Sequence, residues 1–386
     1  MNLNASILLQ LTHLAVFAAA VCVSWVLTRW MEDLSFRFGY LDYPGGRKQH
    51  ERPTPVLGGV AIFISFWGVV WTGLWASRAV KALGGYDWIP DVAALTPQIL
   101  GIFAGSLILC LVGLLDDRYH WSPLRKLAGQ LVAALILLGL GLTINLFSGL
   151  GDIGYGLTLV WVLLIVNAFN FIDSVDGHCA GVALISATSF FWITQVLNQP
   201  MVGLFLVALC GALLGFLPRN FKPARIFLGD NGSLFLGYVM AAITLLAHYQ
   251  NPAGSPASAL VPLLIFGVPI YDTVSVVCVR LRRGQAPWRG DRNHFAHRLV
   301  KMGMSDKIAV TFSYLTTLTI GFIAILTTQV HSTLGTALVL LVFLCILSVI
   351  AFLEFYAARR QRVIDELIRT HRRRREDIRE AEDRMF

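Results

Sequence analysis

Aspartates are concentrated in four short motifs, each at the edge of an apolar stretch. They are Asp116 and Asp117 in LLDDRYHWSPLRK, Asp173 and Asp176 in NAFNFIDSVDGHCAG, Asp230 in IFLGDNGSLFLG, and Asp272 in PIYDTVSV. A single acid beside an apolar segment is as often a helix cap or a satisfied polar contact as a functional group. Four such motifs are harder to explain as caps, because a cap needs one acid. These carboxylates therefore indicate a functional site.

Several carboxylates near several cations suit the chemistry of phosphates. Mg²⁺ binds one or two carboxylates and completes its octahedral shell with water and substrate phosphates. Asp173 and Asp176 are three residues apart, so a helical turn would place both on one face. The cations expected to face the acids are Arg47, Lys48, Arg52, Arg125, Lys126, Arg289, Arg292 and Arg298, with His50, His294 and His297. This combination predicts magnesium-dependent phosphoryl transfer.

Other metal, nucleotide and redox chemistries are less well supported by the residues. The sequence contains no P-loop motif, which argues against a P-loop ATPase. His294 and His297 supply two zinc ligands, but no third ligand is nearby in the sequence. The six cysteines are scattered, mostly in apolar runs, without a CxxC pair, and are interpreted as small core residues.

The composition places these motifs in an integral membrane protein. The 386 residues are 56% hydrophobic and 14% charged, and the mean hydropathy is +0.66, whereas soluble domains are about 25% charged. A bilayer-crossing helix needs about 20 apolar residues. Uncharged stretches predict single spans at 3–28, 53–77, 96–115, 127–151 and 153–172. Three longer uncharged stretches, 179–218, 231–271 and 308–353, are each expected to contain two spans. Turn signals at 198–200, 251–258 and 331–333 divide them. The fold class predicted is an all-α membrane protein of about eleven transmembrane helices.

The distribution of positive charge predicts the orientation of this bundle. With eleven spans, all but two of the 31 Lys and Arg residues, Arg78 and Lys81, fall on one side, which is therefore the cytoplasm. The N-terminus is then outside, and the C-terminus and the acidic motifs are cytoplasmic. The first span has no positive charge before Arg29, so it is expected to be retained rather than cleaved. We expect one polytopic domain over 1–357 and a charged cytoplasmic tail over 358–386. The membrane surface explains the net charge of +8 without nucleic acid as a partner.

Five motifs, in order along most of the chain, resemble those of the polyprenyl-phosphate N-acetylhexosamine-1-phosphate transferases. They are DYPGGRKQHERPTPVLGG (42–59), LLDDRYHWSPLRKLAGQ (114–130), NAFNFIDSVDGHCAG (167–181), FLGDNGSLFLG (227–237) and DRNHFAHRL (291–299). The RKQH and DRNH blocks are more similar to the WecA-like branch than to the MraY-like branch, whose consecutive histidines and longer insert after the paired aspartates are absent. The chain departs from the WecA-like pattern at Ala296, where a further histidine is usual, and this departure bears on the sugar preference.

The resemblance implies an enzyme of the cell (inner) membrane, with cytoplasmic catalytic loops. It would transfer a sugar-1-phosphate from a UDP-sugar to a polyprenyl phosphate and release UMP, and the favoured group is N-acetylglucosamine-1-phosphate. This reaction would be the first membrane step of cell-envelope polysaccharide synthesis. The implied cofactor is Mg²⁺, with Mn²⁺ as an alternative, and a homodimer is left open. By motif, the catalytic residues are Asp116, Asp117, His294 and His297; the substrate-binding residues are Lys48, Lys126, Asn170, Asp173, Asp176, Phe227 and Arg292; and the metal site comprises Asp230 and Asn170.

Two alternatives come from other functional classes. A transporter or flippase fits the number of spans and a membrane-embedded Asp272, but its binding site is expected near the midplane, whereas the acids here gather at one face. A regulatory or scaffold protein acting through the basic tail is the second alternative.

Overall fold

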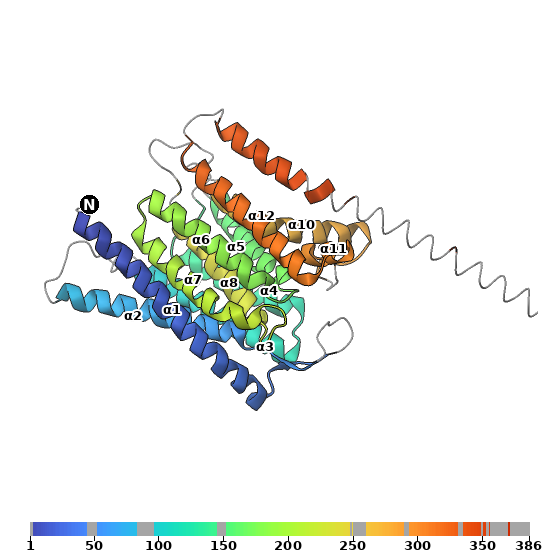
Figure 1. Cartoon of the computed structure of the whole chain (residues 1–386), viewed down its shortest axis with the longest axis horizontal. Helices are drawn as coiled ribbons and strands as arrows, with labels where there is room; N and C mark the ends of the chain where they lie inside the picture. Colours follow the sequence, from blue (N-terminus) through green and yellow to red (C-terminus); the bar gives the residue numbers. More distant parts are fainter. Residues whose placement is uncertain are drawn as a thin grey trace, which may run out of the picture.

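The computed structural model describes residues 3–44, 52–82, 96–144, 152–247, 249, 260–288, 293–330, 335–348, 350–352, 355 and 370. Over these residues the chain is a bundle of helices, most of which run alongside one another (Figure 1). The helices are α1 (Leu3–Phe38), α2 (Gly58–Ala82), α3 (Thr96–Tyr119), α4 (Pro123–Gly139), α5 (Asp152–Ile172), α6 (His178–Val196), α7 (Pro200–Asn220), α8 (Asp230–Leu246), α9 (Val261–Ile265), α10 (Gly267–Arg282), α11 (Phe295–Lys301) and α12 (Asp306–Thr327), followed by a helix at Gly335–Phe352.

Eight of the helices in the described part of the chain are long and apolar enough to cross a membrane. They are α1, α2, α3, α5, α6, α7, α12 and the helix Gly335–Phe352. The other three predicted spans fall on the shorter helices α4 and α8 and on α9 with α10. The turn predicted at 198–200 separates α6 from α7, while those at 251–258 and 331–333 lie outside the described residues, as does the predicted tail apart from Thr370. The chain is therefore an all-α multi-pass membrane protein.

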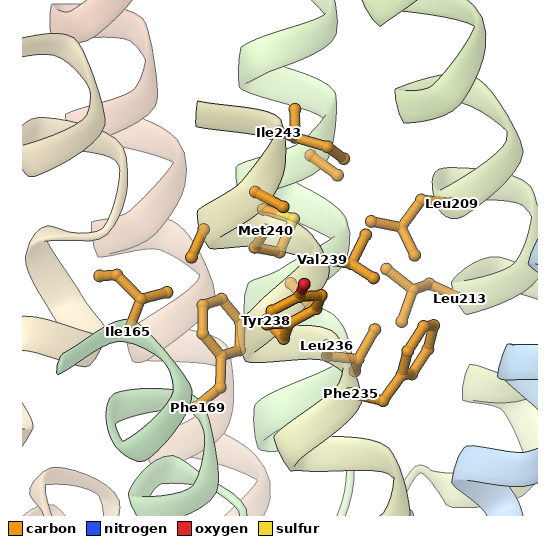
Figure 2. Packing of buried hydrophobic residues seen from close by; sticks show 14 of the residues in the cluster. Ile165, Phe169, Leu209, Leu213, Phe235, Leu236, Tyr238, Val239, Met240 and Ile243 are labelled. Atoms are coloured by element: carbon orange, nitrogen blue, oxygen red, sulfur yellow. The ribbon is translucent and has the colours of Figure 1, made fainter. Parts of the chain in front are cut away.

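Helix α8 is the centre of the bundle. It packs mainly against α3 and α5 and also contacts α2, and nearly all of its side chains are buried. Figure 2 shows part of the surrounding core, with Phe235, Leu236, Tyr238, Val239, Met240 and Ile243 of α8, Ile165 and Phe169 of α5, and Leu209 and Leu213 of α7. The Tyr238 hydroxyl lies 3.2 Å from the carbonyl oxygen of Ala133 in α4. This packing holds the first residue of α8, Asp230, in a defined position.

A two-stranded antiparallel sheet connects α1 to α2. Strand β1 (Leu41–Asp42) pairs with β2 (Thr54–Pro55). The N–H of Phe227 donates to the carbonyl oxygen of Pro55 at 2.7 Å, and the N–H of Gly58 donates to that of Phe227 at 3.1 Å. These bonds tie the segment before α8 to the connection between α1 and α2.

The predicted helical turn at Asp173 and Asp176 is wrong. Helix α5 ends at Ile172, and residues 173–177 form a non-helical turn before α6. Gly177 closes this turn at φ 75°, a left-handed conformation that glycine adopts without the steric cost of a Cβ atom. The two aspartates therefore lie on a loop at the end of the bundle.

The expectation that the acidic motifs lie at helix ends is wrong for Asp272, because α10 continues to Arg282. The helix can extend beyond the apolar run because the charge of Arg280, which is 2% exposed, has partners. Its guanidinium donates to the carbonyl oxygen of Pro287 and lies 5.1 Å from the ring centroid of Phe171. Asp272 is consequently in the interior of a helix.

Candidate active site

A cavity of about 1280 Å³ opens where α3, α5 and α7 end and where α6 and α8 begin. Its lining is rich in charge of both signs. The acids are Asp42, Asp116, Asp117, Asp173, Asp176 and Asp230, and the basic and imidazole groups are Arg52, Arg118, His120, Lys222, Arg225 and His297. Such a lining suits a ligand that carries phosphates together with a divalent cation.

Asp117 and α8 are joined by three hydrogen bonds. The Oδ1 atom of Asp117 accepts from the N–H of Asp230 at 3.0 Å, and its Oδ2 atom accepts from the N–H and the side-chain amide of Asn231 at 3.2 and 2.6 Å. The free N–H groups at a helix start favour a negative charge. Asp117 therefore caps α8 from another helix.

Close contact between α3 and α8 makes this capping geometrically feasible. Gly113 lies one helical turn before Asp117, and a Cβ atom added there would be 2.2 Å from the backbone nitrogen of Asn231. A side chain at this position would push the two helices apart. The glycine thus determines how near the Asp117 carboxylate comes to α8.

Lys126 of α4 connects the two remaining carboxylates of this group. Its Nζ atom donates to Asp116 Oδ2 at 3.0 Å and to Asp230 Oδ2 at 2.8 Å. The three side chains are partly buried, with 23%, 13% and 25% of the surface of Lys126, Asp116 and Asp230 exposed. Asp116 and Asp117 are adjacent in sequence, yet Asp116 contacts a cation and Asp117 contacts backbone amides.

Asn170 supports Asp230 from the other side. Its side-chain amide donates to Asp230 Oδ1 and to the Ser233 hydroxyl, both at 2.9 Å. One turn earlier in α5, the amide of Asn167 donates to Gln130 Oε1 at 2.7 Å, which joins α5 to α4 one turn after Lys126. The amide pair thus fixes the two helices that bring Lys126 and Asn170 to Asp230.

Asp173 and Asp176 occupy the turn between α5 and α6. Burial, and then the negative charges of Asp230, Asp117 and Asp176, raise the pKa of Asp173 well above its usual range. Asp176 Oδ2 accepts from the N–H of Ala224 at 3.1 Å, which connects this turn to the loop before α8. Phe227 lies on the same loop and also lines the cavity.

The two histidines of the predicted site have different environments. His297 lines the cavity, whereas His294 is 6% exposed and is not part of the lining. Their ring centroids are 6.5 Å apart. Lys48 and Arg292 lie outside the described residues.

The sequence motifs do not indicate several of the residues that line the cavity. Arg118, His120, Lys222 and Arg225 are the clearest examples. All four are polar residues near the predicted cytoplasmic helix ends, so their position relative to the acidic motifs is the signal that would have identified them.

The residues present fit Mg²⁺ better than Zn²⁺. In the part of the chain that the structure describes, no three His, Cys, Asp or Glu side chains are arranged to hold a metal between them. Zn²⁺ sites are built from three or four such side chains, whereas Mg²⁺ needs one or two carboxylates and takes its other ligands from water and phosphates. The Asp230 carboxylate, partly exposed at the wall of a cavity, fits the second arrangement.

Comparison with known proteins gives a family for this site. The profile of "Glycosyl transferase family 4" matches residues 99–248. The chain is 33% identical over 80% of its length to the "Probable undecaprenyl-phosphate N-acetylglucosaminyl 1-phosphate transferase" of Bacillus subtilis, of which 81% is covered. It is 34% identical over 77% of its length to the decaprenyl-phosphate N-acetylglucosaminephosphotransferase of Mycolicibacterium smegmatis, of which 77% is covered.

A more distant relative extends the same similarity. The undecaprenyl-phosphate alpha-N-acetylglucosaminyl 1-phosphate transferase of Escherichia coli K12 is 26% identical over 76% of this chain and 78% of its own length. These alignments cover most of each protein, and the residues matched by the family profile include both Asp117 and Asp230. The chain therefore belongs to the WecA-like polyprenyl-phosphate N-acetylglucosaminyl-1-phosphate transferases of glycosyl transferase family 4.

Proposed function

We propose that this protein transfers N-acetylglucosamine-1-phosphate from its UDP-sugar to a polyprenyl phosphate and releases UMP. The observation that carries the proposal is the cavity at the helix ends, where acidic and basic side chains are brought together. The names of the relatives specify the polyprenyl-phosphate acceptor and the sugar. The reaction would be the first membrane step in making a cell-envelope polysaccharide.

The proposed topology has eleven crossings, an external N-terminus, and a cavity facing the cytoplasm at the inner membrane. Lys and Arg residues in the segments 116–126 and 219–225 support this orientation, because positive charge favours the cytoplasmic side. A site at helix ends also favours a transferase over a transporter, whose site is expected near the midplane. The division at residue 358 and a homodimer stay predictions.

The reaction we propose is a direct displacement. An oxygen of the polyprenyl phosphate attacks the β-phosphorus of the UDP-sugar, a new P–O bond forms, and the bond to the departing UMP breaks. A phosphate monoester has a second pKa near about 6, so much of the nucleophile is already a dianion at neutral pH. A strong general base is then unnecessary, and Asp116 or Asp117 would orient the nucleophile or accept its last proton.

Asp230 would hold Mg²⁺, or Mn²⁺ in its place, with Asn170 at the same site. The metal when bound would neutralise negative charge on the phosphates. Lys126 would lie beside this charge, since its ammonium group is 2.8 Å from Asp230. A second route, through a phosphorylated aspartate, is less favourable because charge would have to be neutralised twice at one Asp pair.

The nucleotide would bind on the side of the cavity formed by the loop before α8. Phe227 would stack on the uracil, and Asp173 and Asp176 would contact the nucleotide and the surroundings of the metal. Arg225, from the same loop, offers a planar guanidinium suited to phosphate. Further positive or hydrogen-bonding groups would come from His297, Lys48 and Arg292.

The test is an assay of the purified protein in detergent against a panel of UDP-sugars. UDP-N-acetylglucosamine with polyprenyl phosphate should give UMP and a polyprenyl-diphospho-sugar in equal amounts, and either substrate alone should give neither. UDP-glucose and UDP-N-acetylgalactosamine measure the sugar preference. Movement of lipid-linked sugar across vesicle membranes without UMP release would instead support the transporter.

A further inference from the structure

A buried carboxylate contacts His294, one of the two predicted catalytic histidines. Asp272, in the interior of α10, is 0% exposed. Its Oδ2 atom is 2.9 Å from Nδ1 of His294, and its Oδ1 atom accepts a hydrogen bond from the N–H of Phe295, the first residue of α11. The guanidinium of Arg298 is 3.7 Å from Oδ1. One carboxylate therefore contacts a histidine ring, a helix start and a cation.

The chemistry of this contact defines the tautomer of His294. An ionised carboxylate can only accept hydrogen bonds, so the proton between the two groups must be on Nδ1. Nε2 is then the ring nitrogen with a lone pair, and it can accept a hydrogen bond or a proton. A carboxylate that orients the Nδ1–H of a histidine in this way is the arrangement that serine proteases use to hold their catalytic imidazole.

The His294 ring is also close to residues at or near the cavity. Its centroid is 5.6 Å from that of Phe171, two residues before Asp173, and 6.5 Å from that of His297, which lines the cavity. His297 is in the first turn of α11, whose first N–H is held by Asp272. Asp272 thus controls the ring of one predicted catalytic histidine and the helix that carries the other.

We propose that Asp272 is a positioning residue of the transferase site, which fixes the Nδ1-protonated tautomer of His294 and anchors the start of α11. The inference rests on the proposed function. Capping a short helix does not require a fully buried carboxylate, because an exposed Ser, Asn or Asp does the same. Desolvating the carboxylate is costly even beside Arg298, and this cost is understandable if the charge is needed to orient an imidazole.

The first arm of the test measures the contact without any substrate. In His294→Asn, the amide nitrogen takes the place of Nδ1 and can still donate to Asp272, but the variant lacks Nε2. In His294→Ala, Asp272 loses this donor. We expect His294→Asn to melt near the parent protein and His294→Ala to melt several degrees lower. Equal melting temperatures for the two variants would show that the hydrogen bond to Asp272 contributes nothing and would overturn the inference.

The second arm is a double-mutant cycle on turnover per folded molecule. Asp272→Asn should lower kcat about 100-fold, the size of a typical contribution from a positioned acid or base, with little change in KM for the UDP-sugar. His294→Asn should lower kcat to a similar level. If Asp272 acts through His294, adding Asp272→Asn to His294→Asn should cost less than about 3-fold further.

The control variant is Ser275→Ala, which removes the 2.7 Å hydrogen bond from Arg298 to Ser275 Oγ, another contact between α10 and α11. It leaves the His294–Asp272 contact in place and should keep kcat near that of the parent. An Asp272→Asn variant with parental kcat, or with the same loss in both His294 backgrounds, would overturn the positioning role. If the parent released no UMP, the proposed function would fail, and the melting comparison would still test the contact.

Discussion

Asp117 at the end of α3 caps the helix that Asp230 begins, with its Oδ1 atom 3.0 Å from the Asp230 backbone nitrogen. The two residues are 113 positions apart in the sequence and belong to different helices. Asp116, the residue before Asp117, instead accepts a hydrogen bond from Lys126. The paired aspartates therefore make different contacts: Asp117 accepts from the first backbone N–H groups of α8, and Asp116 accepts from Lys126.

Asparagine at each position should separate the effects of these contacts. Asp117→Asn would place an amide group among backbone N–H donors, so we expect a loss of about 1–3 kcal/mol in unfolding free energy together with lower turnover. Asp116→Asn should lower turnover with a smaller fall in melting temperature, because the amide oxygen can still accept the hydrogen bond from Lys126. Thermal melting and UMP release on both proteins test this. Parental melting of Asp117→Asn would contradict the capping role.

The approach of α3 to α8 should be sensitive to a single methyl group. Gly113→Ala would put a Cβ atom 2.2 Å from the Asn231 backbone, and we expect it to destabilise the protein by about 1–3 kcal/mol and to reduce activity. Gly68→Ala, in α2, is the matched control, because nothing lies within 4 Å of the added atom. That control should be neutral or slightly stabilising, as alanine is the better helix former. Similar melting of the two variants would argue against the close contact.

Stability should depend on pH through Asp173. The raised pKa means that the folded protein keeps this proton above the ordinary unfolded value of about 4, where the unfolded chain has released it. Stability from this group is therefore lost as pH rises from about 4 toward the raised pKa. Asp173→Asn removes the effect, so its advantage in melting temperature over the parent, measured with EDTA present, should grow with pH across this window. A difference that is constant with pH would contradict the assigned shift.

The predicted metal ligand has a direct test. Asp230→Asn keeps the shape of the side chain but loses its negative charge, so turnover should collapse, and the remaining activity should need far more Mg²⁺. Asp33→Asn, an exposed carboxylate on α1, is the control and should behave as the parent does. Magnesium titrations of the three proteins decide the matter. An Asp230→Asn protein with normal turnover at ordinary magnesium would remove this residue from the site.

The sequence predicts the helices well because stretches of apolar residues of bilayer length have few alternatives to a helix. It also predicts that the acidic motifs meet, since their helix ends face the same side. One cavity is lined by the acids of three of the four motifs, which are Asp116, Asp117, Asp173, Asp176 and Asp230. Asp272, of the fourth motif, is not part of this lining, and the individual roles of all these residues stay predictions.

The partners of these residues are not predictable in the same way. The cap formed by Asp117 depends on tertiary packing at Gly113, which no local pattern reports. The contact between Asp272 and His294 depends on how the chain folds back after α10. The strands β1 and β2, two residues each, are too short to show the alternation by which a strand is recognised.

In the proposed reaction, lipid phosphate and UDP-sugar occupy the cavity together and react directly. Holding both phosphates in one site contributes to the rate because they no longer diffuse apart. The most direct measurement is UMP release as a function of both substrates, with a rapid-mixing experiment that omits the lipid. We expect intersecting initial-rate lines and no UMP from UDP-N-acetylglucosamine alone. A stoichiometric burst of UMP without lipid, with sugar phosphate trapped on an aspartate, would contradict it.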